Sequence, residues 1–415
     1  MVDSTNEPGW QPLITDPERR AAIAALITDI VAAVGDWRRD HPTTSDDDAD
    51  YATLRIYTAT DDTVPDPDDE AGQALAAAIA AIAQRSAPGL YGGAARVAFA
   101  VGHLSAGDDA DLACEMIEAS LLRYLEQPTD TYDLISGVVG IAVPVLQRIA
   151  DGRPSPSSEP IARSILGHLE RLSRTQPTGL AWHTPASLLP QWQRELAPDG
   201  YINLGLAHGI PGVIAILARY IAAGVEVSRA RRLLDGAVAY LLSVAEPTMG
   251  ARYHAWLPSK GGGTRVAWCY GDLGVAVALM AAASATGRDD WRATALELAH
   301  GMAVRSFESS QVIDAGLCHG AAGVAHVFNR MAQATGDAEL ARAADTWFDH
   351  TIAMRRSEPI AGYPRAMPVN GVINWEAAPD LLTGATGIAL ALHAAISPIE
   401  PAWDQLLLAD LSPTT

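Results

Sequence analysis

One short pattern recurs six times along the chain and constrains its fold more than any other feature. Each copy places a glycine, two residues and a second glycine at the start of an apolar stretch, although Arg96 replaces the second glycine of the first copy. The leading glycines are Gly93, Gly137, Gly209, Gly271, Gly320 and Gly384. They lie 44 to 72 residues apart, which leaves room for two helices and their loops in each interval. Such spacing is typical of stacked helical hairpins.

The composition also favours helices. Apolar residues make up 49% of the 415 residues, but aromatic residues only 6%, so alanine and leucine supply most of the apolar surface. These residues favour closely packed helices over sheets. From residue 71 onward, alanine- and leucine-rich stretches alternate with short breaks. We therefore predict an all-α fold, in which a glycine at each inner helix start permits close approach and leaves backbone N–H groups free.

The N-terminal part of the chain differs from the rest. We expect a helix from Pro17, with Asp16 as its N-cap and the proline in the first turn. Residues 42–70 are rich in aspartate and contain prolines, which predicts an acidic surface loop. We therefore divide the chain into residues 1–70, a helix and loop that belong to or pack on the repeat domain, and residues 71–415, the repeat domain with its site.

The residue before each leading glycine is expected to face a common cavity if the hairpins close into a ring. These residues are Gly92, Ser136, His208, Tyr270, His319 and Thr383. Three are small, but two are histidines and one is a tyrosine. This pattern indicates a repeated scaffold that carries a site on part of its circumference.

Two of the three cysteines occupy the same position of two successive motifs. Cys269 and Cys318 each lie two residues before a leading glycine, and His319 follows Cys318. Two thiolates and an imidazole are zinc ligands, and three protein ligands leave one coordination position open, as in catalytic zinc sites. Small cysteines that merely pack beside glycine are the alternative. Cys114 lies on an apolar helix stripe, which predicts a core position.

These motifs carry a family resemblance. "GLAHGIPG" (205–212), "WCYGDLG" (268–274) and "GLCHGAAG" (316–323) resemble the lanthionine synthetase C family of lanthipeptide cyclases and LanC-like proteins. The resemblance implies an α/α toroid of about seven helical hairpins in two concentric layers around one zinc ion per chain. Only six glycine motifs are present, so the N-terminal helices are expected to form the seventh hairpin.

The resemblance also implies roles for individual residues. Cys269, Cys318 and His319 match the family's zinc ligands, His208 its proposed acid/base, and Asp133, Arg265 and Tyr270 its remaining active-site positions. Other interpretations stay open, because His208 could be structural, Asp133 could cap a helix, and Tyr270 could close the cavity wall. Arg96 departs from the family's glycine at a position expected to be remote from the metal. His326 is expected to point away from the site. Residues 260–265 are interpreted as a lip over it.

The implied reaction is Michael-type addition of peptide cysteine thiols to dehydroalanine or dehydrobutyrine, which forms thioether rings during lanthipeptide antibiotic biosynthesis. The implied partners are a dehydrated precursor peptide and a dehydratase enzyme. One alternative is addition of glutathione or another small thiol to dehydroamino acids. Others are a zinc-dependent prenyltransferase-like toroid, whose ligand set would be Asp/Cys/His, and a non-catalytic peptide-binding scaffold.

Net charge and hydropathy limit the partners and the cellular location that we expect for the protein. The net charge of −20 argues against nucleic acid, since phosphate binding needs a basic surface. The apolar stretches are too short to span a bilayer, and no signal peptide is visible at the start. We therefore expect a cytoplasmic protein with reduced thiols, which would reach a membrane only through a biosynthetic complex.

Overall fold

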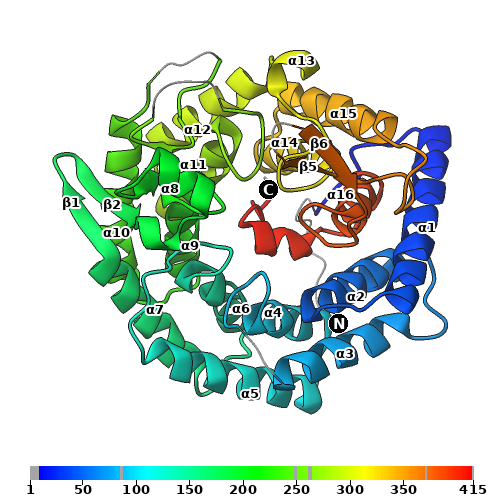
Figure 1. The fold of residues 1–415 in the computed structure, drawn as a ribbon, viewed down its shortest axis with the longest axis horizontal. Helices are drawn as coiled ribbons and strands as arrows, with labels where there is room; N and C mark the ends of the chain where they lie inside the picture. Colours follow the sequence, from blue (N-terminus) through cyan, green and yellow to red (C-terminus); the bar gives the residue numbers. More distant parts are fainter. Residues whose placement is uncertain (1–8, 85–86, 247–249, 260–263, 370–371, 414–415) are drawn as a thin grey trace.

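A computed structural model describes residues 9–84, 87–246, 250–259, 264–369 and 372–413. Its helices form two concentric rings around a central axis (Figure 1). The inner ring contains α2 (Ser45–Thr60), α4 (Ala94–Leu104), α6 (Val138–Ala150), α9 (Ile210–Ala222), α11 (Asp272–Thr286), α14 (Ala321–Thr335) and α16 (Ala385–Ile396). The outer ring contains α1 (Pro17–Asp40), α3 (Glu70–Gln84), α5 (Asp108–Leu125), α7 (Ser158–Leu172), α10 (Val227–Ser243), α12 (Asp289–Ala303) and α15 (Ala338–Ala353).

Each inner helix packs against one outer helix, which gives seven pairs within the described residues. Six pairs are consecutive hairpins, from α2–α3 to α14–α15. The seventh joins the two ends of the chain, because α1 packs against α16. The predicted α/α toroid is thus confirmed, and the hairpin that lacks a glycine motif is built from α2 and α3.

Contacts between the termini close the toroid. The indole N–H of Trp10 donates to the carbonyl of Ala394 at 3.0 Å, and the amide of Ile14 donates to Ala395 at 2.9 Å. On the outer ring, Arg19 of α1 pairs with Asp345 of α15 at 2.6 Å. Helix α1 begins as predicted, since Pro17 is its first residue and Asp16 accepts a hydrogen bond from the amide of Arg19.

The predicted acidic loop is wrong over residues 45–60, which form the inner helix α2. Its aspartates suit a helix start. Thr44 and Asp47 form a capping box, and the carboxylates of the first turn lie at the positive end of the helix dipole. Further along, Tyr51 and Leu54 are buried in the core. The many aspartates therefore made this segment look like a loop, although tertiary packing stabilises it as a helix.

The glycine motifs fold each loop back onto the start of its own inner helix. In α6, the amides of Val138 and Val139 donate to the carbonyls of Thr131 and Tyr132, both at 3.2 Å. At α6, and likewise at α14 and α16, the first helical amides are therefore not free, contrary to our expectation. A side chain at the second glycine would collide with the backbone of this loop, as Gly140 would with the carbonyl of Leu134. The glycines permit this close packing of loop on helix.

The remaining elements belong to neither ring. Strands β1 (Ser173–Gln176), β2 (Gly179–Thr184), β3 (Tyr201–Asn203) and β4 (Trp256–Leu257) form an antiparallel sheet in that order. Between β2 and β3 lie η1 (Ala186–Leu188) and α8 (Gln191–Leu196), while α13 (Phe307–Ser310) and the hairpin β5 (Arg365–Val369) and β6 (Val372–Glu376) follow later. None of the described helices combines the length and apolar character that crossing a bilayer requires.

The C-terminal segment fills the centre of the inner ring (Figure 1). Its short helix η2 (Ala402–Leu407) accepts a hydrogen bond from the indole of Trp268 at the carbonyl of Leu407, at 2.8 Å. Tyr91 donates to the carbonyl of Leu406 at 2.9 Å. Because Trp268 directly precedes Cys269, this segment forms a floor beneath the loops that carry the site.

Candidate metal centre and active site

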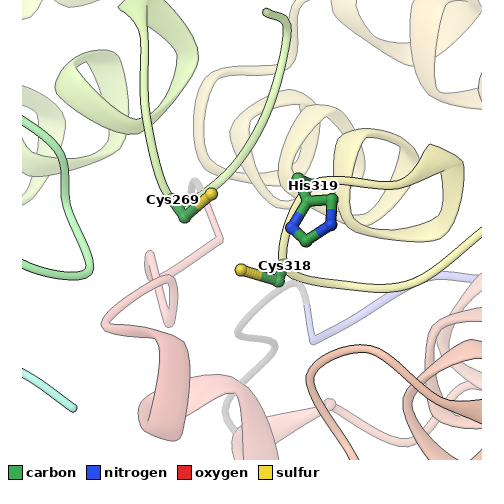
Figure 2. A group of neighbouring side chains, drawn as sticks. All are labelled: Cys269, Cys318 and His319. Atoms are coloured by element: carbon green, nitrogen blue, oxygen red, sulfur yellow. The ribbon is translucent and has the colours of Figure 1, made fainter. Parts of the chain in front are cut away.

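Cys269, Cys318 and His319 come together where two neighbouring inner helices begin (Figure 2). Each offers one ligand atom, and these atoms all lie within 4.8 Å of one another. Cys269 lies in the loop before α11, whereas Cys318 and His319 lie in the loop before α14. No second group of this kind occurs among the residues that the structure describes.

A ring of hydrogen bonds between successive loops places the two cysteines. Its members lie two or three residues before the leading glycines, and we call it the loop ring. The bonds run from the amide of Tyr91 to the carbonyl of Ile135 (2.9 Å), Leu134 to Ala207 (3.1 Å), Ala207 to Cys269 (3.4 Å), Cys269 to Cys318 (3.2 Å) and Cys318 to Leu382 (2.7 Å). The sulfur positions thus follow from a backbone arrangement that every loop shares.

The donor set fits zinc. Ligands about 2.0 to 2.3 Å from a tetrahedral zinc ion lie about 3.5 to 3.8 Å from one another, which the observed grouping accommodates. A hydrogen bond from Cys318, the largest influence, lowers the pKa of the Cys269 thiol, while burial opposes this shift. The same bond raises the pKa of Cys318. The pair therefore favours one thiolate even without a metal. His319 is partly exposed, which leaves one side of the group open.

Asp314 is a neighbour of this group that sequence reasoning missed. It is buried, and its Oδ2 lies 3.9 Å from Nε2 of His319 while accepting the amide of Ala366 at 3.1 Å. Carboxylates beside metal-binding histidines commonly orient the ring. The sequence did contain a signal for Asp314. It lies six residues before Gly320, and Asn203 lies six residues before Gly209, so a polar side chain occupies the same position in two of the loops.

Asp133 and His208 form a close pair on the two preceding loops. Nδ1 of His208 lies 2.6 Å from Oδ2 of Asp133. The other oxygen, Oδ1, accepts the amides of Ser136 at 2.9 Å and Gly137 at 3.0 Å. One oxygen of Asp133 thus caps the turn before α6 and the other holds the imidazole, while its role in the reaction stays a prediction.

The electrostatics of His208 follow from this pairing. Burial disfavours the charged imidazolium, but the hydrogen bond and charge of Asp133 and the charge of Cys269 outweigh it, so the pKa of His208 is raised. The imidazole side chain remains 42% exposed, so its outer edge is accessible. His208 combines a fixed Nδ1 with an accessible Nε2, which is the arrangement that proton transfer requires.

Tyr270 directly follows the proposed ligand Cys269 in the loop before α11, and this loop is the neighbour of the loop that carries His208. Its ring stacks loosely on that of His208, with centroids 6.4 Å apart, and its hydroxyl accepts a hydrogen bond from the side-chain Nδ2 of Asn203 at 3.0 Å. Burial raises the pKa of Tyr270, which keeps the hydroxyl protonated. A side chain at Gly205 would collide with the Tyr270 ring, so this glycine permits the close approach.

Arg265 contributes charge to the group. Its positive charge acts to lower the pKa values of Cys269, Cys318 and His319, but hydrogen bonds and burial contribute more, and the pKa values of Cys318 and His319 are raised overall. Such effects require it to lie near the three side chains. The residues before it, 260–263, which we interpreted as part of a lip, lie outside the described residues.

A pocket of about 350 Å³ opens beside His208 and Tyr270. The toroid loops form one wall and the η1–α8 segment the other. Its further lining residues are Asp130, Thr131, Tyr132, Asp133, Ser136, Thr184, Leu188, Leu189, Pro190, Gln193 and Tyr201. Sequence reasoning missed the wall at 184–193, because this stretch carries no glycine motif.

Three further residues were assigned roles outside the site. Cys114 is fully buried beside helix α4, as expected for a core residue. His326 points away from the site, since its Nε2 lies 2.8 Å from Oδ2 of Asp404 in the C-terminal segment. Arg96 pairs with the buried Asp50 of α2.

The fold and the site together define an α/α toroid with a Cys/Cys/His group at the mouth of its inner ring. The family of lanthionine synthetase C-like proteins matches residues 51–408, so the chain belongs to this family. Among solved structures, it is similar to nisin cyclase, with a TM-score of 0.75 and 16% sequence identity over 92% of this chain and 97% of that chain. A sequence comparison with curated proteins finds no significant match.

Proposed function

We propose that this protein is a zinc-dependent lanthipeptide cyclase, which adds peptide cysteine thiols to dehydroalanine or dehydrobutyrine to form thioether rings. Membership of the lanthionine synthetase C-like family and the fold shared with nisin cyclase support a cyclase of this general kind. The observation that carries the finer proposal is the grouping of Cys269, Cys318 and His319 beside the Asp133–His208 pair.

Cys269, Cys318 and His319 would hold the zinc ion. Zinc bound by three protein ligands keeps one position for a substrate thiol, and it would lower the pKa of that thiol so that it reacts as a thiolate near neutral pH. The positive charge of Arg265, which acts on all three ligands, would offset the negative charge of the sulfurs.

His208 would supply the proton that the enolate takes up, and the proton released when the substrate thiol ionises would restore it, so the overall addition consumes none. As the substrate sulfur bonds to the β-carbon, the electrons of the double bond move toward the neighbouring carbonyl and give an enolate. The α-carbon then takes a proton to complete the product. Asp133 holds Nδ1 of His208, so Nε2 is the nitrogen that would deliver this proton. The Tyr270 hydroxyl and Arg265 would stabilise the enolate oxygen.

The pocket beside His208 would hold the peptide segment that carries the dehydroamino acid. It adjoins the proton donor, and its outer wall offers Leu188, Leu189 and Pro190 as apolar contacts. The substrate would be a precursor peptide already dehydrated by a partner dehydratase. We place the reaction in the cytoplasm, where peptide thiols stay reduced.

The decisive experiment incubates the purified protein with a dehydrated cysteine-containing precursor peptide and then blocks free thiols before mass spectrometry. Ring formation adds no mass but removes sites for the blocking reagent, so the account predicts loss of blocked thiols over time. Glutathione is included in a parallel reaction. Addition of glutathione without loss of peptide thiols would support the small-thiol alternative and contradict the proposal.

A further inference from the structure

The loop ring has six glycine loops to serve seven inner helices, which leaves one position without a loop of this type. That position belongs to α2, whose N-terminal residues follow no glycine motif. There, Oδ2 of Asp50 accepts the amide of Leu381 at 2.7 Å. The side chain of Asp46 accepts the amide of Gly92 at 2.6 Å. Two carboxylates of α2 thus take the place of the missing loop.

Asp50 is joined to the next loop through Arg96. Its Oδ1 accepts a hydrogen bond from the Arg96 guanidinium. Both residues are almost fully buried, with exposed fractions of 3% for Asp50 and 1% for Arg96. Burial, the largest influence, raises the pKa of Asp50 to about 7, although the charge of Arg96 opposes the rise. The guanidinium also lies under the ring of Tyr91, 5.6 Å from its centroid. Tyr91 is the loop-ring residue of the first motif.

Asp50 is connected to the proposed zinc ligand Cys318 through only two intervening residues, Leu381 and Leu382. Leu381, whose amide Asp50 accepts, is followed by Leu382, whose carbonyl accepts the amide of Cys318 at 2.7 Å. Every other link to a cysteine in the loop ring is made by backbone groups. The link from α2 to Leu381 depends on the carboxylate of Asp50, so a single substitution can remove it.

We propose that Asp50 and Arg96 close the loop ring and act as positioning residues for the zinc ligand Cys318. This inference rests on the metal site of the proposed function. It also explains the departure of the first motif, because glycine at position 96 could not hold the carboxylate that completes the ring. Removing either partner leaves the other buried without its counter-charge, which is costly.

The test is zinc affinity, measured by competition with a chromophoric chelator on the full-length protein. Asp50→Ala removes the acceptor for both Leu381 and Arg96, and we expect its dissociation constant for zinc to rise about tenfold, the range seen when support of a metal ligand is lost. Arg96→Gly, which restores the glycine of the other five motifs, is expected to weaken zinc binding less. In the metal-free protein, hydrogen exchange over residues 316–320 is expected to accelerate in both variants.

Arg148→Gln is the matched control. Arg148 is 3% exposed and pairs with the buried Glu118 at 3.3 Å, but it lies near the far end of the inner helix α6. The Arg148→Gln variant should lose about as much stability as Asp50→Ala, but its zinc affinity should stay within about twofold of the wild-type value. Wild-type affinity in folded Asp50→Ala, or in folded Arg96→Gly if the alanine variant does not fold, would overturn the inference. So would equal weakening in Arg148→Gln. A wild-type protein that binds no zinc would instead refute the metal site itself.

Discussion

Two arcs of the loop ring share their backbone but differ in their side chains. In the loops before α9, α11 and α14, the residues preceding the leading glycines are His208, Tyr270 and His319. In the loops before α16 and α4 they are Thr383 and Gly92. The loops of both arcs hydrogen-bond to neighbouring glycine loops through equivalent backbone groups, whereas the loops before α16 and α4 are joined to α2 by the carboxylates of Asp50 and Asp46. The scaffold is therefore uniform, and chemistry is added to one arc by changing one or two side chains in each loop.

One pair of residues shows this separation most clearly. Asp133 and Asp380 each lie four residues before a leading glycine, and each accepts an amide of its own turn. Oδ1 of Asp380 accepts the amide of Thr383 at 2.7 Å, and its Oδ2 accepts the hydroxyl of Thr383 at 3.0 Å. Oδ2 of Asp133 instead holds His208. The cap is common to the loops before α6 and α16, whereas the bond to a histidine belongs to the loop beside the site.

The largest expected effect comes from the sulfur ligands. Cys269→Ala or Cys318→Ala should abolish zinc binding and reduce ring formation to the unassisted rate, because two protein ligands do not hold the ion. Cys114→Ala is the control, and it should keep both while losing about 1 kcal/mol of stability. Metal analysis and the thiol-blocking assay on the same preparations measure both outcomes. Release of zinc by Cys114→Ala would contradict the assignment.

His208→Asn should have the next largest effect. Loss of an acid/base group usually slows catalysis by about a hundredfold or more. The variant should keep its zinc, since Nδ1 of His208 is engaged by Asp133 rather than by the ligand group. Time courses of ring formation, with zinc measured in parallel, test this. Wild-type rates would remove His208 from the mechanism, and loss of zinc would make it part of the metal site.

Asp133→Asn and Asp380→Asn sharpen the comparison between the arcs. Asp133 raises the pKa of His208, so removing its charge should lower that pKa. If protonated His208 donates the proton, activity is lost as pH rises through its pKa, and the alkaline limb of the kcat profile should move to lower pH. Asp380→Asn should leave the limb in place. Equal shifts in both variants would contradict a specific role for Asp133.

The smallest effect is expected at the outer wall of the pocket. Leu188 lines the pocket and is 46% exposed, so it is available to an apolar part of the peptide. Leu188→Asp should raise KM about fivefold, which corresponds to loss of about 1 kcal/mol of apolar contact, and leave kcat unchanged. Val304→Asp, at an exposed residue that does not line this pocket, is the control. An unchanged KM for Leu188→Asp would exclude this wall from peptide binding.

Much of this arrangement was predictable from the sequence because it is local and repeated. The glycine motifs predicted the hairpins, and the shared register of Cys269 and Cys318 predicted that they would meet. The features that were missed depend on contacts between distant parts of the chain. Helix α2 was obscured by its aspartates, although these cap its first turn. The hydrogen bond between Asp50 and Leu381 joins residues that are 331 positions apart in the chain, so no local sequence pattern predicts it.

The strands at 173–203 were missed for a related reason. This stretch has no repeated motif, and its pairing includes β4 at Trp256–Leu257, more than fifty residues further along the chain. Strand pairing over such distances leaves little trace in a single sequence. Asp314 was missed because its distance from His319 depends on how the loop folds back onto its helix.

The central claim is that one arc of a uniform scaffold holds a zinc ion with an open coordination position. Metal analysis combined with X-ray absorption spectroscopy of the purified protein tests it most directly. The account predicts about one zinc per chain, with two sulfur ligands, one nitrogen ligand and one exchangeable light-atom ligand that a small thiol replaces. Natively folded protein that binds no zinc, or zinc with four protein ligands and no response to added thiol, would contradict it.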